Sequence, residues 1–389
     1  MRTYLDHNAT TPLAPAVLEA MIPVLREQFG NASSVHMFGQ TAKAQVDGAR
    51  AAVADLIGAR PQEIVFTSGG TEADNLAIRG VAEAAAPGRK RHVVASAIEH
   101  EAVLKTLKVL SRHGWKTSLV PVAENGIVAP DALEAALTDE TVLVSVMHAN
   151  NEIGTVQPIA ELAAMARGRG ALFHTDAVQS AGKLPLAVDR LGVDLLSLSA
   201  HKLNGPKGVG ALWVRRGVRL VAGQTGGGQE RSRRAGTENV PGIAGFGAAA
   251  RGAAGAVDSS RAEIAALRDR LETGILENVP GTVVNGDRGQ RVPNTTNISF
   301  EGIEAESLLI ALDLEGVAVS TGSACSSGTL EPSHVLRAMG CSPHRTQSSI
   351  RFSLGLGNTT GQIDRVVEIL PRVVGKLRTL ARPPQAVGA

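Results

Sequence analysis

The chain has few cysteines, no long apolar run and almost no excess of either charge, and each shortage excludes a class of protein. The two cysteines, Cys325 and Cys341, are too few for a disulfide framework and form no CxxC pair of the kind that binds zinc. No apolar run reaches the roughly 18 residues of a membrane span. The 39 basic and 37 acidic residues give a formal net charge of +2, and no basic block predicts nucleic-acid binding.

The first residues also lack a secretory signal. Asp6, His7 and Asn8 lie where a signal peptide would need its apolar core. A chain with so few cysteines needs no oxidising compartment. We therefore expect a cytoplasmic protein, with no metal site, no nucleic-acid partner and no membrane association.

What is present is the composition of a globular protein, with 43% hydrophobic and 20% charged residues over 389 residues, a length that favours two domains. In the first part, short apolar runs alternate with Ala-rich helical stretches. Strands are predicted at 64–67, 92–97, 141–148, 171–175, 195–199 and 210–214, and helices at 72–86, 101–113 and 159–167. This alternation indicates an α/β fold with a mostly parallel sheet covered on both faces and ligands at the carboxyl ends of its strands.

The pattern changes near residue 255. A helix is predicted over 262–277, short strands at 282–285, 296–300, 318–320 and 347–354, and a last helix over 362–380. This mixture favours a smaller α+β domain. We predict a large domain over residues 15–258 and a small domain made of residues 1–14 and 259–389.

A glycine-rich turn between a predicted strand and a predicted helix is the first candidate for ligand binding. It reads Ser68-Gly69-Gly70-Thr71-Glu72. Glycines let the backbone approach an anion, and the first N–H groups of the helix would point at it. The turn alone does not distinguish a phosphate site from an ordinary tight turn with a capping threonine.

Two further strand ends carry ionisable residues. Asp176 follows the strand at 171–175 and can either face a ring nitrogen of a ligand or cap a helix. Lys202 follows the strand at 195–199, in a turn bounded by glycine and proline. Burial there would lower the pKa of the amine and make it available for a Schiff base. A solvated loop lysine is the alternative, and Lys207 is the competing candidate in the same turn.

These segments, in this order, resemble the fold-type I enzymes that use pyridoxal phosphate (PLP), and among them the class V aminotransferase group. The full set resembles cysteine desulfurases of the NifS/IscS type over nearly the whole chain. The matching segments are residues 4–12, 30–34, 68–72, 99–101, 150–154, 174–179, 197–208, 234–239, 322–326 and 349–352. The resemblance implies an aspartate aminotransferase-like large domain with a seven-stranded mixed sheet, and a small domain that carries a cysteine loop.

By this similarity, Lys202 forms the Schiff base with PLP and later moves protons at the substrate's α-carbon. Asp176 would pair with the pyridinium nitrogen, where a carboxylate keeps the ring protonated, and Gln179 would bond to the ring hydroxyl. His100 would stack on the ring and could take part in proton transfer. The phosphate would be held by the Gly70 backbone, Thr71, Ser199 and His201.

The resemblance also implies contacts to the substrate and between subunits. Asn31 and Asn151 would contact the substrate, and Asn151 the cofactor as well. Arg351 would bind the substrate carboxylate, for which a guanidinium fork is well suited, although a surface salt bridge is the alternative. Thr237 would reach the phosphate of the neighbouring subunit, which implies a homodimer.

Cys325 determines which reaction is expected. It lies in a run of small residues, and an exposed thiol is nucleophilic even when only a few per cent is ionised. We expect it to attack the sulfur of L-cysteine, to carry a persulfide and to pass the sulfur to an acceptor protein, while L-alanine leaves. An inert buried thiol is the alternative for any single cysteine, and it suits Cys341.

Other functions stay open at this point. A selenocysteine lyase would use the same scaffold without a protein persulfide, and an ordinary aminotransferase would not need Cys325. The alternative that is not an enzyme is a non-catalytic dimeric scaffold for sulfur-transfer partners. The sulfur acceptor could serve iron–sulfur cluster assembly, tRNA thiolation or nitrogenase assembly.

Overall fold

The structure is a computed structural model that describes residues 2–85, 90–322 and 332–381. Its main sheet has seven strands in the order β2-β8-β7-β6-β5-β3-β4. These are β2 (Ile64–Thr67), β3 (His92–Ser96), β4 (Lys116–Val120), β5 (Thr141–Ser145), β6 (Leu172–Asp176), β7 (Leu195–Ser199) and β8 (Gly210–Val214). β8 alone runs antiparallel to its neighbours. The expected seven-stranded mixed sheet is confirmed, and β4 is the strand that the apolar pattern missed, because only one of its residues is buried.

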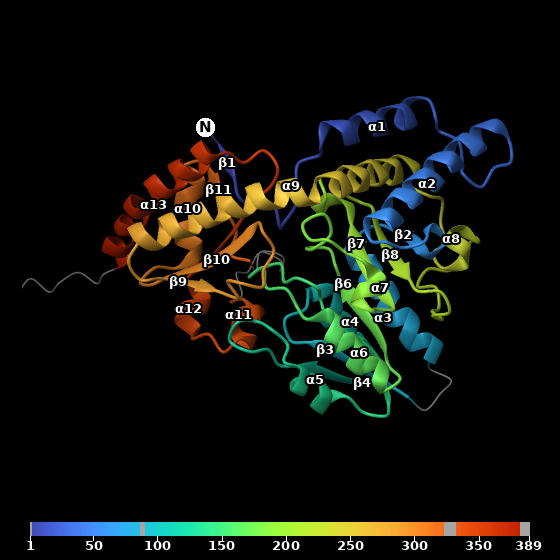
Figure 1. The fold of residues 1–389 in the computed structure, drawn as a ribbon, viewed down its shortest axis with the longest axis horizontal. Helices are drawn as coiled ribbons and strands as arrows, with labels where there is room; N and C mark the ends of the chain where they lie inside the picture. The colour runs from blue at the N-terminus through green and yellow to red at the C-terminus, as the bar shows by residue number, and fades with distance from the viewer. Residues whose placement is uncertain (1, 86–89, 323–331, 382–389) are drawn as a thin grey trace, which may run out of the picture.

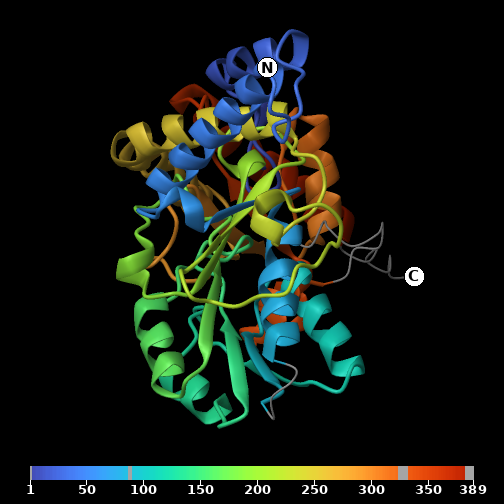
Figure 2. The same cartoon turned by 90° about the vertical axis from the view of Figure 1, so that its right-hand side faces the viewer.

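Helices cover both faces of this sheet. They are α1 (Pro15–Arg26), α2 (Met37–Leu56), α3 (Gly70–Ala85), α4 (Glu101–Arg112), α5 (Pro130–Ala136), α6 (Ile159–Gly168), α7 (Val188–Leu191), α8 (Gln229–Ser232) and α9 (Val240–Asn278). Figure 2 shows α6 and the pair α3 and α4 on opposite sides of the strands.

The core explains this arrangement. Because side chains alternate along a strand, Val93 and Leu195 pack with α3 and α4 on one face. Their neighbours Val94 and Leu196 pack with α2, α6 and α9 on the other. Strands buried on both faces read as continuous apolar runs, which is why most of them are visible in the sequence.

A second, smaller set of elements follows. A three-stranded antiparallel sheet has the order β12-β10-β9, and β1 pairs with β11. The elements are β1 (Thr3–Tyr4), β9 (Thr282–Asn285), β10 (Thr295–Phe300), α10 (Ala305–Leu314), β11 (Val317–Ala318), α11 (His334–Ala338), α12 (Pro343–Gln347), β12 (Ser349–Ser353) and α13 (Thr360–Ala381). They share a core with the C-terminal half of α9 and with Leu5.

Helix α9 connects the two sets. It begins at Val240, well before the predicted start at residue 262, and runs unbroken past both sheets (Figure 1). The predicted domain boundary between residues 258 and 259 lies within it and stays a prediction. Among the described helices, none combines the length and the apolar character that crossing a membrane requires.

Candidate active site

A pocket of about 250 Å³ lies at the carboxyl ends of the parallel strands. Asp176 is the last residue of β6, Ser199 is the last residue of β7, and α3 begins at Gly70, just after β2 ends. The structure brings together at this pocket most of the residues predicted to bind cofactor or substrate. They are Gly70, Thr71, His100, Asn151, Asp176, Gln179, Ser199, His201, Lys202 and Arg351.

Three predicted residues are not part of this pocket as described. Asn31 and Thr237 are exposed and do not line it. Cys325 lies outside the described residues. Ser320 and Gly322, shortly before it in the sequence, do line the pocket.

Lys202 lies in a 3₁₀ turn, Ala200–Lys202, directly after β7. Its Nζ donates hydrogen bonds to the backbone oxygens of Asn8 at 2.5 Å and Ala9 at 2.6 Å. Gly205 closes the turn, and a Cβ there would lie 2.7 Å from the Ala200 oxygen. The competing Lys207 is exposed and does not line the pocket.

Asp176 occupies the floor of the pocket. Its Oδ1 accepts a hydrogen bond of 2.8 Å from the Val178 N–H. Burial raises the pKa of this carboxyl, while the Val178 N–H and the charges of His100 and Lys202 lower it. A buried carboxyl of this kind is stabilised as the anion when a cation, such as a protonated ring nitrogen, lies next to it.

Asp74 is a pocket residue that the sequence reasoning missed. It projects from α3, is 1% exposed and lines the pocket. Burial and then the charge of Asp176 raise its pKa well above the ordinary value. Asp74, Ile78 and Val81 are all buried and have the spacing of one helical face. A carboxyl on an otherwise apolar helix face is the signal that could have revealed it.

His100 caps the N-terminus of α4. Its Nδ1 accepts a hydrogen bond of 3.1 Å from the Ala102 N–H, which requires the neutral ring with its proton on Nε2. Burial lowers the pKa of this histidine, and the Lys202 charge adds to the effect against the opposing charge of Asp176. The cap therefore orients a neutral imidazole at the pocket.

Arg351 lies in the middle of β12 and its side chain is 4% exposed. One guanidinium nitrogen, Nη2, donates to Asp6 Oδ1 at 2.7 Å, and Nη1 donates to the Asn151 oxygen at 3.0 Å. Its Nε is buried without a hydrogen-bond partner. Asp6 is a second residue that sequence reasoning did not assign to the site, and in this ion pair Arg351 is buried whereas Asp6 is partly exposed.

The opposite end of the pocket has the features of an anion site. The N-terminus of α3 supplies backbone N–H groups, and Thr71, Ser199 and His201 supply side chains. A Cβ on Gly70 would lie 3.0 Å from Val178 Cγ2, so a larger residue would crowd this end. Burial and the charges of Lys202 and Lys207 lower the pKa of His201 to about 4, so this ring is neutral near pH 7.

This set of groups fits PLP. A buried carboxyl suits a protonated ring nitrogen, a lysine amine suits an aldehyde, and a helix N-terminus with hydroxyl groups suits a phosphate. No cluster of His, Cys, Asp and Glu that could hold a metal occurs in residues 2–85, 90–322 and 332–381.

Comparisons with known proteins agree with this chemistry. The family described as Aminotransferase class-V matches residues 3–366. Cysteine desulfurase IscS of Methanosarcina thermophila is 49% identical over 97% of this chain and 93% of its own length. A solved structure described as a NifS-like protein is 39% identical, covers 97% of this chain and all of its own, and superposes with a TM-score of 0.91. A structure described as SspA in complex with cysteine is 37% identical over 90% of this chain and 98% of its own, with a TM-score of 0.81.

Proposed function

The chain belongs to the aminotransferase class-V family, and from this membership we propose that it is a PLP-dependent cysteine desulfurase. It would convert L-cysteine to L-alanine and receive the sulfur on Cys325. The main structural support for this proposal is that Lys202, Asp176 and Arg351 line the same pocket. These three side chains could bind an aldehyde, a ring cation and an amino-acid carboxylate, respectively. The cysteine desulfurase names of relatives at about half identity support the substrate.

When bound, PLP would supply an electron sink for the carbon skeleton of the amino acid. The amine of Lys202 would bind it covalently and then move the proton at the substrate's α-carbon. Asp176 would hold the ring nitrogen protonated, and Gln179 would donate to the ring oxygen. His100, neutral and with its Nε2–H available, could hold or deliver a proton above the ring.

Arg351 would orient the substrate by its carboxylate. The guanidinium is fixed from two sides by Asp6 and the Asn151 oxygen, so a carboxylate meets a donor set that is already positioned. Asn151 also lines the pocket and would contact both cofactor and substrate.

The sulfur step is assigned to Cys325. Its thiolate would attack the substrate sulfur as the C–S bond breaks, and the bonding electrons would pass to the carbon skeleton. One hydrogen from the two thiols ends on the β-carbon, so the products are alanine and a Cys325 persulfide. The position of Gly322 at the pocket, shortly before Cys325 in the sequence, supports this assignment.

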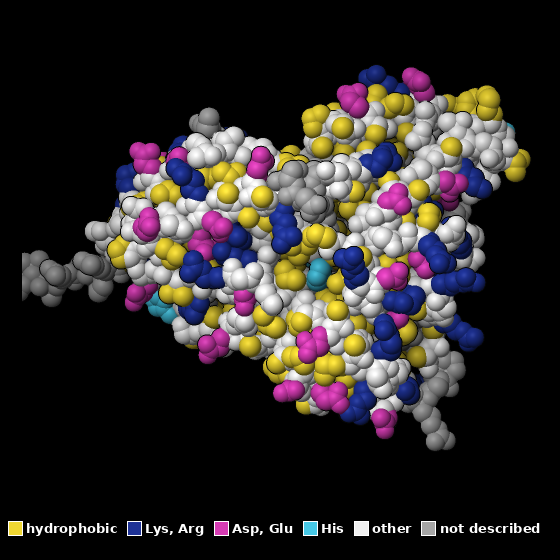
Figure 3. Space-filling view, viewed as in Figure 1, with side chains coloured by type: hydrophobic (Ala, Val, Ile, Leu, Met, Phe, Trp, Pro, Cys, Tyr) yellow, Lys and Arg dark blue, Asp and Glu magenta, His cyan; other side chains and the backbone are white. Residues whose placement is uncertain are grey.

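We also propose a homodimer with shared sites. Thr237 is exposed and lies outside the pocket of its own chain, as expected if it reaches the phosphate in the other subunit. Large apolar side chains are exposed on α1 and on the segment that leads into α2, and Figure 3 shows part of this surface. They are Leu18, Leu25, Phe29, Val35, Met37 and Phe38. Burying such a surface in a second copy would stabilise the dimer and could bring the exposed Asn31 to the partner's substrate.

The persulfide would then pass to an acceptor protein, such as an iron–sulfur cluster scaffold. A cytoplasmic location would suit this role, because a reducing compartment keeps the Cys325 thiol available.

An absorbance spectrum, followed by addition of L-cysteine and a reductant, tests the function. We expect a near-visible band that shifts on addition, with alanine and sulfide released in equal amounts. Amino transfer to an oxo acid without sulfide would make the protein an aminotransferase. Full sulfide release by Cys325→Ala would remove the persulfide step, and the absence of any band after adding PLP would favour a non-catalytic scaffold.

A further inference from the structure

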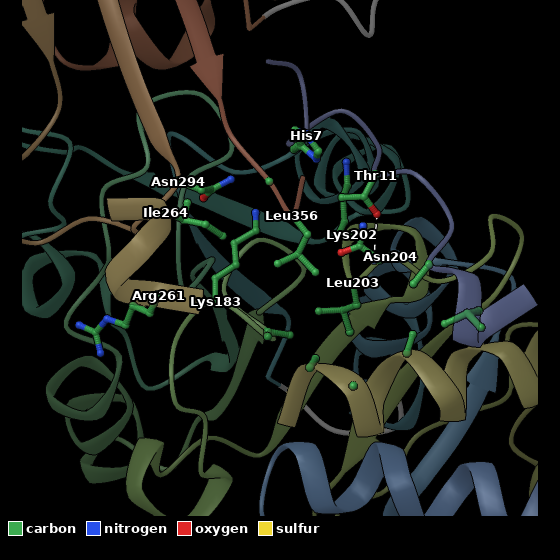
Figure 4. A pocket seen from close by; sticks show the side chains of 18 of the residues that line it. His7, Thr11, Lys183, Lys202, Leu203, Asn204, Arg261, Ile264, Asn294 and Leu356 are labelled. Atoms are coloured by element: carbon green, nitrogen blue, oxygen red, sulfur yellow. Dashed lines mark hydrogen bonds between the residues drawn. The ribbon is translucent and has the colours of Figure 1, made fainter. Parts of the chain in front are cut away.

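A second cavity, of about 190 Å³, adjoins the candidate active site. Lys202 is among the residues that line both cavities. The walls of the second cavity come from α1, α9, the turn after β7 and the segment after β12. They are mainly apolar and include Val17. Leu203, Ile264 and Leu356 also belong to them (Figure 4).

The described ionisable residues that line this cavity are all bases. They are His7, Lys183, Lys202 and Arg261, and none of the described residues that line the cavity is an aspartate or glutamate. An apolar enclosure strengthens the interaction of any charge with its surroundings. Because the described part of its lining has amines and no carboxylate, the cavity is suited to an anion.

Lys183 is the group best placed to bind that anion. Its Nζ donates to Gln179 Oε1 at 2.9 Å and to Asn8 Oδ1 at 3.1 Å. An ammonium group has three hydrogens, so one remains for a ligand. Figure 4 shows this nitrogen pointing into the space between Asn294 and Leu356, whereas the guanidinium of Arg261 points away from it.

The charge state of Lys183 agrees with an anion site. Burial, and then the charges of Lys202 and Arg351, lower its pKa to about 7. The other bases that face it are His7, whose pKa is lowered to about 4 by burial and by the charge of Lys183, and Arg261 at the edge of the cavity. A bound anion would oppose these effects and stabilise the ammonium form.

The size of the cavity limits the ligand. An apolar cavity of about 150 Å³ is large enough for benzene, and this one is slightly larger. We propose that the cavity binds a small carboxylate with an apolar body of about one aromatic ring, with the carboxylate on Lys183 and the body against Val17, Leu203 and Leu356.

Such a ligand would also act on the active site. The Lys183 amine, which would bind the ligand, also donates a hydrogen bond to the Gln179 side-chain oxygen. The Gln179 Nε2 in turn donates to the Asn8 backbone oxygen at 3.0 Å. In the PLP-loaded protein, Gln179 is also the residue proposed to donate to the ring oxygen. Occupation of the cavity would therefore shift the near-visible band of the PLP-loaded protein, a consequence that rests on the proposed function, whereas binding itself does not.

Benzoate is the probe, titrated into the PLP-loaded protein in a calorimeter at pH 6.5. We expect saturable binding that Lys183→Met weakens at least tenfold, because the methionine keeps the apolar stem and removes the charge. Ala253→Leu should weaken it comparably by filling the cavity from α9. The exposed lysine variant Lys376→Met is the matched control and should leave the affinity unchanged. Benzyl alcohol, which has the same ring without the charge, should bind at least tenfold more weakly than benzoate.

The pH dependence distinguishes Lys183 from the other cations. Since burial lowers the pKa of Lys183 to about 7, the affinity should fall about fivefold between pH 7 and pH 8. Loss of binding in Arg351→Lys, with Lys183→Met and Ala253→Leu unaffected, would place benzoate in the substrate site and overturn the proposal. Absence of saturable binding in the wild-type protein would overturn it as well. Because the readout is heat and not sulfide, failure here is distinguishable from failure of the desulfurase assignment.

Discussion

Asp6 and Arg351, at opposite ends of the sequence, form an ion pair with an Oδ1–Nη2 distance of 2.7 Å. The bridge between Asp6 and Ser353 brings the N-terminal segment beside β12. The ion pair fixes the Arg351 guanidinium, and Arg351 lines the pocket. The Arg351 Nε is buried and has no hydrogen-bond partner. We infer that Asp6 acts as a positioning residue for the arginine that would bind the substrate carboxylate.

Replacement of Asp6 by asparagine tests this role. The variant keeps the shape but loses a charge-assisted hydrogen bond, which contributes about 1.5–3 kcal/mol. We expect the KM for L-cysteine to rise about tenfold or more, with a smaller change in kcat, because binding is affected more than chemistry. Steady-state kinetics of sulfide release measures both. Asp364→Asn, which breaks the exposed pair with Arg270, is the matched control. An unchanged KM in Asp6→Asn would remove the positioning role.

His100 can be separated into its structural and chemical roles. Asparagine is itself a good N-cap, so His100→Asn should retain α4 while removing the imidazole from the pocket. We expect kcat to fall about 100-fold, the lower end of what a proton-transfer group contributes, with a melting temperature close to that of the wild type. His113→Asn, an exposed position at the C-terminal end of the same helix, should change neither. A kcat that stays within a factor of two would show that the imidazole only caps the helix.

Local sequence pattern was sufficient for most of the main sheet, including the edge strand β2, but not for the opposite edge strand β4. The strands β2, β7 and β8 match the predicted ranges at both ends, because strands buried along their whole length are mostly apolar runs bounded by glycine or polar residues. β4 was missed because Lys116 and Leu119 are exposed. Its pairing with β3 comes from the fold and leaves no strong local signal.

The candidate site shows the same limit. Lys202, Asp176 and Gly70 follow strands, so the sequence could place them at one edge of the sheet. Asp6 and Asp74 could not be assigned in this way, because their roles depend on contacts between distant segments. For Asp6, the partner is 345 residues away in the chain. Long-range ion pairs of this kind have no local pattern.

Glu99 should make stability depend on pH. It is fully buried, and burial followed by the charge of Asp176 raises its pKa to about 8, against the hydrogen bonds from Ser96 and the Met147 N–H. Because the folded state holds this proton more tightly than the unfolded state, the stabilising contribution is complete below about pH 4.5 and is lost as the pH rises toward 8.

Glu99→Gln removes this titration. Relative to the wild type, the variant should gain about 2 kcal/mol between pH 5 and pH 7, since each pH unit corresponds to about 1.4 kcal/mol. Urea unfolding of both proteins at the two pH values measures the difference. The exposed Glu161→Gln on α6 should show a constant offset. A constant offset in Glu99→Gln too would mean that this carboxyl is ionised in the folded protein.

The buried pair of Arg50 and Glu230 is expected to hold the segment that carries Thr237. Arg50 donates from Nη1 and Nη2 to the two carboxylate oxygens of Glu230, each at 2.7 Å, and the Phe66 N–H donates to Glu230 Oε2 at 3.0 Å. Glu230 has a φ of 46°, a left-handed conformation that costs a non-glycine residue about 1–3 kcal/mol. The ion pair therefore offsets both the backbone strain at Glu230 and the cost of removing the two charged side chains from water.

Glu230→Ala should destabilise the protein by about 3–5 kcal/mol, because it leaves the Arg50 charge buried without a counter-charge. Glu134→Ala, which removes the partner of the exposed Arg169, should cost less than about 1 kcal/mol. The double variant Arg50→Met, Glu230→Met should lose less than the two single changes combined, since no unpaired charge then remains. Denaturant unfolding of these three variants, of the two single methionine variants and of the wild type gives these differences. Additive losses in the double variant would show that the two side chains stabilise the fold independently, through packing, and that the charge pair is not what holds this segment against β2.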